Sequence, residues 1–310
     1  MADMQSNGQA QRSHALQWSV LSGGGYQVCG RTLPKLPEGA YDCDADMDGQ
    51  IRFNPRTLKV DELIDCSAGL ASTLLKEIEQ FWTLGERFHK HGFLHRRGYL
   101  LHGRQGSGKS SVVHQVICRT VAAGGVAFFC EHPSTFFSCM QQFRSVEPQR
   151  PILCIFEDID SMTQGYGSIA LLQWLDGNHQ VDRVVNIATT NYPEKLERRL
   201  IARPRRFDRV LCINCPDREL RDAYFARKLP ELSVEERRRW VELSDDLSFA
   251  SMSELIISVC CLDKDLAETA ALLKDLDRKQ PSSSEYDEYS QGERSGRSGG
   301  RNSYDDKVPF

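Results

Sequence analysis

Apolar and polar positions in the middle of the chain alternate between two periodicities. Short continuous apolar runs, typical of buried strands, occupy residues 98–102, 126–130, 152–156, 184–189 and 210–214. Between them, apolar residues recur at helical spacing over residues 109–122, 135–143 and 169–175. Alternation of this kind predicts a parallel sheet with helices on both faces. The expected fold class is therefore α/β.

Two helical patterns flank this region. Apolar side chains recur at helical spacing between residues 71 and 91, at Leu74, Leu75, Ile78, Phe81, Trp82 and Leu84. Four histidines in and after this segment are read as surface residues: His89, His91, His95 and His102. From residue 217 to 276 the pattern is helical throughout, and Ser233 and Glu236 have the spacing of a capping box that opens one of these helices.

The first sixty residues have a different character. Residues 1–14 are polar and are expected to be disordered, whereas residues 15–60 carry short apolar alternations broken by glycine and proline, which predicts a small β-rich module. Alternate aspartates from Asp44 imitate the start of a calcium loop, but its twelfth position, which needs a bidentate glutamate, is Pro55. A tight hairpin turn at Asp48-Gly49 explains the segment better than calcium does.

Composition narrows the functional classes. A net charge of −4, with 40% hydrophobic and 26% charged residues, is typical of a soluble globular protein and disfavours a general binder of nucleic acid or anionic membranes. Since no apolar run reaches the ~18 residues of a membrane helix, we expect no membrane contact and a cytoplasmic location. Residues 279–310, rich in Ser, Gly, Arg and Asp, are expected to be disordered.

The 11 cysteines of a non-secreted chain are expected to be reduced thiols, mostly buried. Cys212 and Cys215 have the spacing of half a zinc site, but no second pair with this spacing completes four ligands. They also lie in an apolar run that reads as a strand. Zinc is therefore only a minor alternative here.

A glycine-rich segment between a predicted strand and a predicted helix carries the strongest chemical signal. Gly103-Arg-Gln-Gly-Ser-Gly-Lys-Ser110 satisfies the Walker A pattern in the context that confirms it. Backbone N–H groups would surround the phosphates of ATP, Lys109 would reach the β- and γ-phosphates, and Ser110 would bind Mg²⁺. The residues expected to contact the nucleotide are Gly103, Arg104, Gln105, Gly106, Ser107, Gly108, Lys109, Ser110 and Ser111.

A second signal follows about fifty residues further along, where the apolar run 152–156 ends directly in Glu157 and Asp158. A Mg²⁺-dependent ATPase needs one carboxylate for the water shell of the metal and another to orient the attacking water. Charged residues that simply end a strand would give the same local pattern. The separation of about fifty residues between the glycine-rich segment and this acidic pair favours a catalytic role for the two carboxylates.

Three more segments complete the order of motifs of one family. They are Leu171-Leu-Gln-Trp-Leu-Asp-Gly177, Asn186-Ile-Ala-Thr-Thr-Asn191 and the arginine-rich stretch 196–209. Together with the two motifs above, they resemble the AAA family of P-loop ATPases over residues 63–276. The resemblance implies a parallel-sheet ATPase core, a helical lid and a ring homo-oligomer of hexameric type. The expected layout is a disordered segment at 1–14, the β-rich module at 15–60, the AAA core at 61–216, the lid at 217–278 and a disordered tail at 279–310.

The resemblance also implies roles for individual residues. Asn191 matches the polar sensor that contacts the γ-phosphate or the attacking water. Arg203 and Arg206 match the arginine fingers that reach the ATP of a neighbouring subunit. A basic nucleic-acid patch is the alternative for the arginines at 198–209, but the interleaved Pro204-Arg-Arg-Phe-Asp208 favours fingers.

Within the family, the order Glu157-Asp158 and the stretch Arg97-Gly-Tyr-Leu-Leu101 most resemble the clade of the mitochondrial respiratory-complex (cytochrome bc) assembly ATPase. That clade has Glu-Asp where most relatives have Asp-Glu. In register, Glu157 takes the metal role, partly through water, and Asp158 takes the water-orienting role. We expect this chain to lack the membrane anchor of that clade.

The expected function is that of a chaperone-like, Mg²⁺-dependent AAA ATPase that remodels or assembles a protein partner. Residues 131–149 lack the aromatic–hydrophobic–glycine loop that threads unfolded polypeptides, and Gly165-Tyr166-Gly167 is either a secondary central loop or a plain turn. Remodelling of a folded partner is thus favoured over threading. An ATP-driven nucleic-acid machine, such as a helicase loader, and a slowly hydrolysing nucleotide-dependent scaffold are the alternatives.

Overall fold

The computed structural model describes residues 17–20, 26–29, 32–45, 49–58, 69–176, 181–201 and 205–278. The segments predicted to be disordered, 1–14 and 279–310, lie outside these residues. The chain divides into two units, residues 1–37 and 38–310. In the first unit, β1 (Gln17–Val20) and β2 (Tyr26–Cys29) pair as an antiparallel two-stranded sheet.

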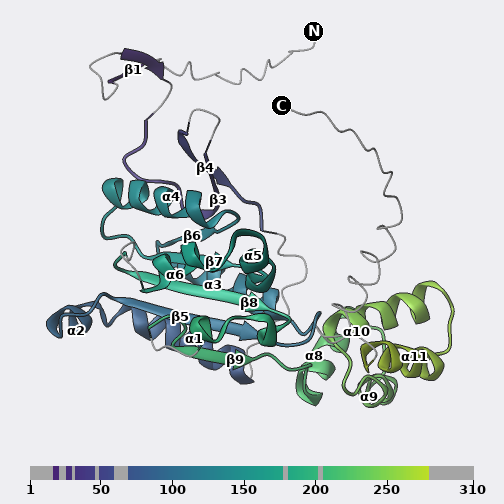
Figure 1. Ribbon diagram of the computed structural model, residues 1–310. Helices are drawn as coiled ribbons and strands as arrows, with labels where there is room; N and C mark the ends of the chain where they lie inside the picture. Colours follow the sequence, from purple (N-terminus) through teal and green to yellow (C-terminus); the bar gives the residue numbers. More distant parts are fainter. Residues whose placement is uncertain are drawn as a thin grey trace, which may run out of the picture. The chain divides into compact units, whose positions relative to one another are not determined.

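The second unit is built on a seven-stranded sheet (Figure 1) with the order β4-β3-β6-β7-β8-β5-β9. Its strands are β3 (Gly39–Ala45), β4 (Ile51–Pro55), β5 (Arg96–His102), β6 (Val126–Phe129), β7 (Ile152–Phe156), β8 (Val184–Thr190) and β9 (Arg209–Cys212). All neighbouring strands are parallel except the β3–β4 hairpin. The predicted α/β fold with a mostly parallel sheet is confirmed.

Helices cover both faces of this sheet, which explains why its inner strands are continuously apolar. The helices of this region are α1 (Gly69–Trp82), α2 (Gly85–Lys90), α3 (Lys109–Ala122), α4 (Pro133–Val146), α5 (Ile159–Tyr166), α6 (Ile169–Asp176), η1 (Pro193–Lys195) and α7 (Arg198–Ile201). On one face, α1 and α3 share a hydrophobic cluster with alternate strand residues such as Ile155 and Ile187. On the other, Phe136 of α4 lies edge-on to Phe156 and to Trp174 of α6.

The N-terminal boundary differs from the expected one. β3 and β4, which fall within the module expected at 15–60, extend the central sheet, with Gly39 of β3 opposite Val126 of β6. Ala40 and Tyr41 are buried in the core. The partner strand is far away in sequence, so local periodicity carries no sign of this pairing.

The hairpin expected around Asp48-Gly49 is present. β3 and β4 pair antiparallel with Ala45 opposite Ile51, and Gly49 has a φ of +76°. Residues 46–48, which include two of the aspartates of the calcium-like pattern, lie outside the described residues. The structure therefore supports the turn and leaves the calcium alternative untested.

His95 was expected on the surface and is buried. Its ring stacks on Phe81 with the centroids 4.0 Å apart, and its Nε2 lies 2.8 Å from the carbonyl oxygen of Phe81. Burial lowers the pKa of this imidazole, and the contact with Phe81 opposes that shift. A single histidine between Leu94 and Arg96 gives no local signal of burial, because the aromatic side chains that enclose it belong to α1 and α2.

Four α-helices and a π-helical turn follow the sheet: α8 (Arg218–Lys228), α9 (Val234–Leu243), α10 (Phe249–Ile256), η2 (Ile257–Cys261) and α11 (Leu266–Arg278). They have a hydrophobic cluster of their own around Phe225, Trp240 and Met252. The predicted capping box opens α9: Glu236 N–H donates to Ser233 Oγ, and Ser233 N–H donates to Glu236 Oε2. Over the described part of the chain, each helix is too short or too polar to span a bilayer.

The turn before β9 approaches β5 without space for a side chain. A Cβ added to Gly98 would lie 2.0 Å from the carbonyl oxygen of Arg206. Two hydrogen bonds fix this approach: Gly98 N–H donates to Asp208 Oδ2, and Asp208 N–H donates to Gly98 O, each at 2.8 Å. Gly98 therefore holds the arginine-rich turn against the end of the sheet.

We expect Gly98→Ala to lower the free energy of unfolding by about 1–3 kcal/mol, because backbone must move to admit the methyl group. Thermal or urea unfolding measures this. Gly165→Ala is the control, since a Cβ there meets nothing within 4 Å. Equal stability of the two variants would contradict the close approach.

Candidate functional site

The glycine-rich segment forms a loop between the end of β5 and the start of α3. Gly108 has a φ of +101° and is the N-cap of α3, so this position favours glycine. The loop also lies tightly on its neighbours, since a Cβ at Gly103 would lie 2.2 Å from the carbonyl oxygen of Ile213. The backbone N–H groups at the start of α3 are therefore offered to an anion, as the Walker A pattern predicts.

Lys109 is the cation of this loop. Its side chain is nearly buried, and Nζ donates to the carbonyl oxygens of Gly103 and Arg104, both at 2.9 Å. Burial lowers the pKa of Lys109, while Asp158 and Asp160 act in the opposite direction. The loop thus holds the ammonium group in place before any phosphate arrives.

The acidic pair follows β7. Asp158 has a φ of +44° and is the N-cap of α5. Its N–H donates to Thr189 Oγ1 at 3.2 Å, and its Oδ1 accepts from Asn191 Nδ2 at 3.4 Å. Burial raises the pKa of Asp158 most, Asp160 raises it further, and Lys109 lowers it.

A buried hydrogen bond joins the first turn of α5 to the end of β8 behind these groups. Thr190 Oγ1 donates to Asp160 Oδ1 at 2.5 Å and accepts from Tyr192 N–H at 3.0 Å. Asp160 and Thr190 are both buried. This link fixes Asn191, which directly follows Thr190, beside Asp158.

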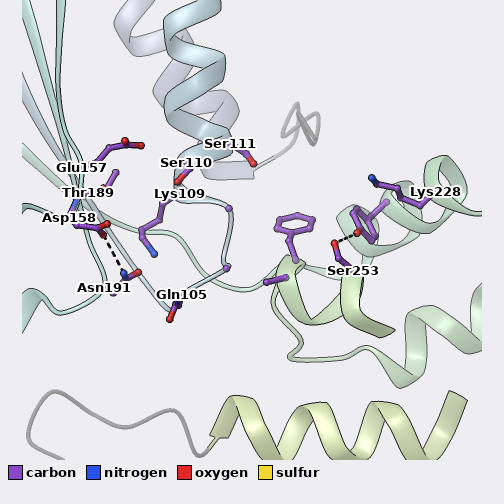
Figure 2. A pocket seen from close by; sticks show the side chains of 15 residues that line it. Gln105, Lys109, Ser110, Ser111, Glu157, Asp158, Thr189, Asn191, Lys228 and Ser253 are labelled. Atoms are coloured by element: carbon purple, nitrogen blue, oxygen red, sulfur yellow. Dashed lines mark hydrogen bonds between the residues drawn. The ribbon is translucent and has the colours of Figure 1, made fainter. Parts of the chain in front are cut away.

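These groups line a pocket of about 360 Å³ (Figure 2) between the sheet and the C-terminal helices. Its residues are Gln105, Gly106, Gly108, Lys109, Ser110, Ser111, Glu157, Asp158, Thr189, Asn191, Tyr224, Lys228, Phe249, Ala250 and Ser253. In Figure 2, Lys109 points toward Asp158 and Asn191, while Lys228 and Ser253 lie on the opposite side. The structure thus brings together the loop, both acids and the sensor asparagine that the sequence predicted.

The pocket wall formed by α8 and α10 was missed by sequence reasoning. Phe249 N–H donates to Gly106 O at 3.0 Å, and Tyr224 OH lies 2.7 Å from Ser253 Oγ. Helical periodicity marked these segments as core, but no motif distinguishes Tyr224 or Lys228 from other helix residues. A nucleotide bound in the pocket would lie between this wall and the glycine-rich loop 103–110, hereafter the phosphate loop.

Three residues of the expected set do not line the pocket. Gly103 contributes only its carbonyl, to Lys109. Arg104 points to the lid, where its Nη1 lies 3.4 Å from Asp246 Oδ1. Ser107 is buried, and within the described residues its Oγ has no hydrogen-bond partner. Contact of these side chains with ATP remains a prediction.

Part of the chain that includes these residues matches the model of a known protein family. Residues 99–215 match the family model described as "ATPase family associated with various cellular activities (AAA)". The matched range contains the phosphate loop, both acids and Asn191. The chain carries an AAA ATPase domain.

Several relatives share this AAA domain. The ATP-dependent zinc metalloprotease FtsH of Hahella chejuensis is 30% identical over 220 residues, which are 62% of this chain and 34% of that protein. The "Probable mitochondrial chaperone bcs1" of Schizosaccharomyces pombe is 28% identical over 211 residues, 63% of this chain and 44% of that protein. The mitochondrial inner membrane i-AAA protease supercomplex subunit YME1 of Saccharomyces cerevisiae is 27% identical over 221 residues, which are 65% of this chain and 28% of that protein.

The predicted resemblance is therefore confirmed for the AAA domain, and a chaperone of the expected clade is among the relatives. The chain spans about a third of the length of the FtsH relatives. The absence of membrane contact stays a prediction, since one relative is described as an inner-membrane subunit.

Of the two expected arginine fingers, the structure describes Arg206, which does not line the pocket. Arg206 is buried; its Nε donates to Asp176 Oδ2 at 2.6 Å, and its Nη1 contacts the carbonyl oxygen of Arg199. Arg203 lies outside the described residues. Arg206 is thus engaged by its own chain, and a role on the ATP of a neighbour would require it to leave Asp176.

Oxygen donors suited to Mg²⁺ face the pocket of the AAA domain. Ser110 and Glu157 both line it beside Lys109, and hydroxyl and carboxylate oxygens are the ligands that this hard cation prefers. Among the described residues, no group of three or more His, Cys, Asp or Glu is placed to hold a metal by itself. The residues therefore fit a Mg²⁺ that is shared with nucleotide phosphates.

We expect Lys109→Ala to abolish detectable ATP binding while the fold persists, because it removes the cation that the loop holds at the phosphate position. Binding of a fluorescent ATP analogue measures the loss of affinity, and circular dichroism shows whether the fold persists. Lys264→Ala, a lysine outside the pocket, is the control. Unchanged affinity of Lys109→Ala would refute the site.

Proposed function

We propose that the chain binds ATP with Mg²⁺ in this pocket, hydrolyses it, and uses the energy to remodel or assemble a protein partner. The observation that carries the proposal is the convergence of Lys109, Ser110, Glu157, Asp158 and Asn191 on one pocket. Phosphoryl transfer needs little beyond such positioning and charge compensation. Bound Mg²⁺ would neutralise charge on the phosphates.

Contacts around the two acids support different roles for them. Asp158 accepts a hydrogen bond from the sensor Asn191, and the nearby Lys109 lowers the pKa of Asp158. We therefore assign to Asp158 the role of orienting the attacking water. Glu157 lies toward Ser110 (Figure 2), so we assign it to the metal, partly through water. The raised pKa of Asp158 would make it a better proton acceptor than an exposed aspartate.

An exposed aromatic group supports a protein partner. Tyr166, at the end of α5, is 56% exposed, and its ring lies edge-on to His132 with the centroids 5.1 Å apart. Ile169, nearby at the start of α6, is 67% exposed. Exposed apolar side chains of this kind suit a protein surface better than a phosphate backbone. The proteases and the chaperone among the relatives also act on proteins by their descriptions.

We also propose that the chain works as a ring of identical subunits, with Arg203 and Arg206 serving the ATP of a neighbour. The support is the family resemblance and the position of the turn 205–208 directly before the edge strand β9, where it is hydrogen-bonded to Gly98. The cytoplasmic location and the hexameric number are parts of this proposal and rest on the sequence.

Asp158→Asn should keep ATP binding but lower kcat by about 10²–10⁴-fold, because an amide cannot accept a proton from water. Glu157→Gln should instead raise the Mg²⁺ concentration needed for hydrolysis. Steady-state ATPase assays over a Mg²⁺ series separate the two. If the two phenotypes are exchanged, so are the two roles.

Mixed rings test catalysis between subunits. Because Arg206 is buried and paired with Asp176, Arg206→Ala is expected to destabilise the fold, so Arg203→Ala is the better finger variant. Arg203→Ala alone should lose about 10³–10⁵-fold in kcat. Mixed with Asp158→Asn it should regain part of the activity, because some interfaces then pair an intact acid with an intact finger. If ATPase activity does not recover in mixtures that demonstrably co-assemble, catalysis between subunits is contradicted.

A further inference from the structure

A cation from outside the AAA match lies against the first acid of the pocket. Arg56 follows β4, and its N–H donates to Ala40 O at 2.8 Å, which continues the β3–β4 hairpin by one residue. Its guanidinium carbon lies 3.9 Å from the ring centroid of Phe129, the last residue of β6. The hairpin thus fixes the base of this side chain, and the aromatic face supports its charged end.

Three carboxylates surround this guanidinium. Nη1 lies 2.7 Å from Asp42 Oδ1 and 3.9 Å from Glu131 Oε1, whereas Nη2 lies 3.7 Å from Glu157 Oε2. The two nitrogens face different acids, so the planar group bridges Asp42 on β3 to Glu157 after β7. A lysine ammonium is a single point of charge without this planar fork, so it could not face each acid with a different nitrogen.

We propose that Arg56 is a positioning residue that holds the Glu157 carboxylate in the orientation in which, with Ser110, it receives nucleotide-bound Mg²⁺. The inference rests on the proposed function for the metal role of Glu157. Arg56 is not among the residues that line the pocket, so it acts through Glu157. Asp42 in turn holds Arg56.

The physical reason is the freedom of the glutamate side chain. Glu157 is about a third exposed, at 34%, and without Arg56 it would move among several rotamers. A ligand fixed in advance loses less entropy when it binds, which favours binding. Outer-shell partners of metal ligands contribute about 10–100-fold to metal affinity or activity by such fixation.

The alternative is that Arg56 only fastens the hairpin to the sheet. Fastening would change the stability of the fold and affect nucleotide binding equally with and without the metal. Positioning of Glu157 would change only the part of binding that depends on Mg²⁺. The two roles are therefore separable by measurement.

The experiment measures binding of a fluorescent, non-hydrolysable ATP analogue to the full chain, over a Mg²⁺ series and in EDTA. We expect Arg56→Gln to raise the half-saturating Mg²⁺ concentration about tenfold, with affinity in EDTA within about twofold of wild type. The half-saturating Mg²⁺ concentration of Arg56→Lys should lie between that of wild type and that of Arg56→Gln. Asp42→Asn should shift the Mg²⁺ dependence in the same direction, although Asp42 does not line the pocket.

The matched control is Arg237→Gln. Arg237 is similarly exposed, at 26%, and donates from Nε to an aspartate, Asp222, at 2.9 Å, but both residues lie on the C-terminal helices outside the pocket. This variant should leave the Mg²⁺ dependence unchanged. Broadening of the Mn²⁺ resonance in electron paramagnetic spectra, with Mn²⁺ in place of Mg²⁺, gives a second readout without nucleotide turnover.

An unchanged Mg²⁺ dependence of Arg56→Gln would overturn the inference, as would an equal loss of affinity in EDTA. If Arg56→Gln does not fold, Asp42→Asn and Arg56→Lys decide by the same criterion. A wild-type chain that binds the analogue with Mg²⁺ but does not hydrolyse ATP would contradict the proposed function and leave this inference standing.

Discussion

Parallel strands end at the same edge of a sheet, and this constraint places each polar or charged group that the sheet contributes to the pocket. Lys109 comes after β5, Glu157 and Asp158 come after β7, and Asn191 comes after β8. The register sets their relative heights, since Leu101 lies opposite Thr189 and Phe156 lies opposite Ala188. A slip of one residue would move a strand by about 3.3 Å, which is enough to break the contact between Asn191 and Asp158.

The same edge is closed from two directions by segments that the family motifs do not contain. From the C-terminal side, the N–H of Phe249 is bonded to Gly106, so α10 begins on the phosphate loop itself. From the N-terminal side, Arg56 crosses Phe129 to reach Glu157. The lid and the β3–β4 hairpin are thereby each connected to the pocket by identifiable interactions.

Sequence reasoning found what is local and missed what depends on distant contacts. The phosphate loop, Glu157 and Asp158 could be found because each directly follows a strand and its spacing is tied to that strand, whereas Asn191 was predicted from the resemblance to the AAA family. β3 was assigned to a separate module because its partner β6 is remote in sequence. Tyr224 and Lys228 look like ordinary helix residues, and nothing in the sequence distinguishes His95 from the exposed His89 and His91. Their places are set by tertiary packing, which local periodicity does not record.

The electrostatics of the pocket sets a condition on what can bind there. Burial lowers the pKa of Lys109 and raises that of Asp158, so the pocket disfavours the charged form of each group, and the charge of the other group opposes that shift. An approaching phosphate favours the charged lysine but repels the Asp158 carboxylate, which would raise its pKa further. A protonated Asp158 could not accept a proton from water. A divalent cation bound with the phosphates would have the opposite effect on the pKa of Asp158, so the proposed function predicts that metal and nucleotide bind together. Arg56 pairs with Glu157 from outside the pocket, whereas Lys109 lies beside Asp158 at the phosphate position.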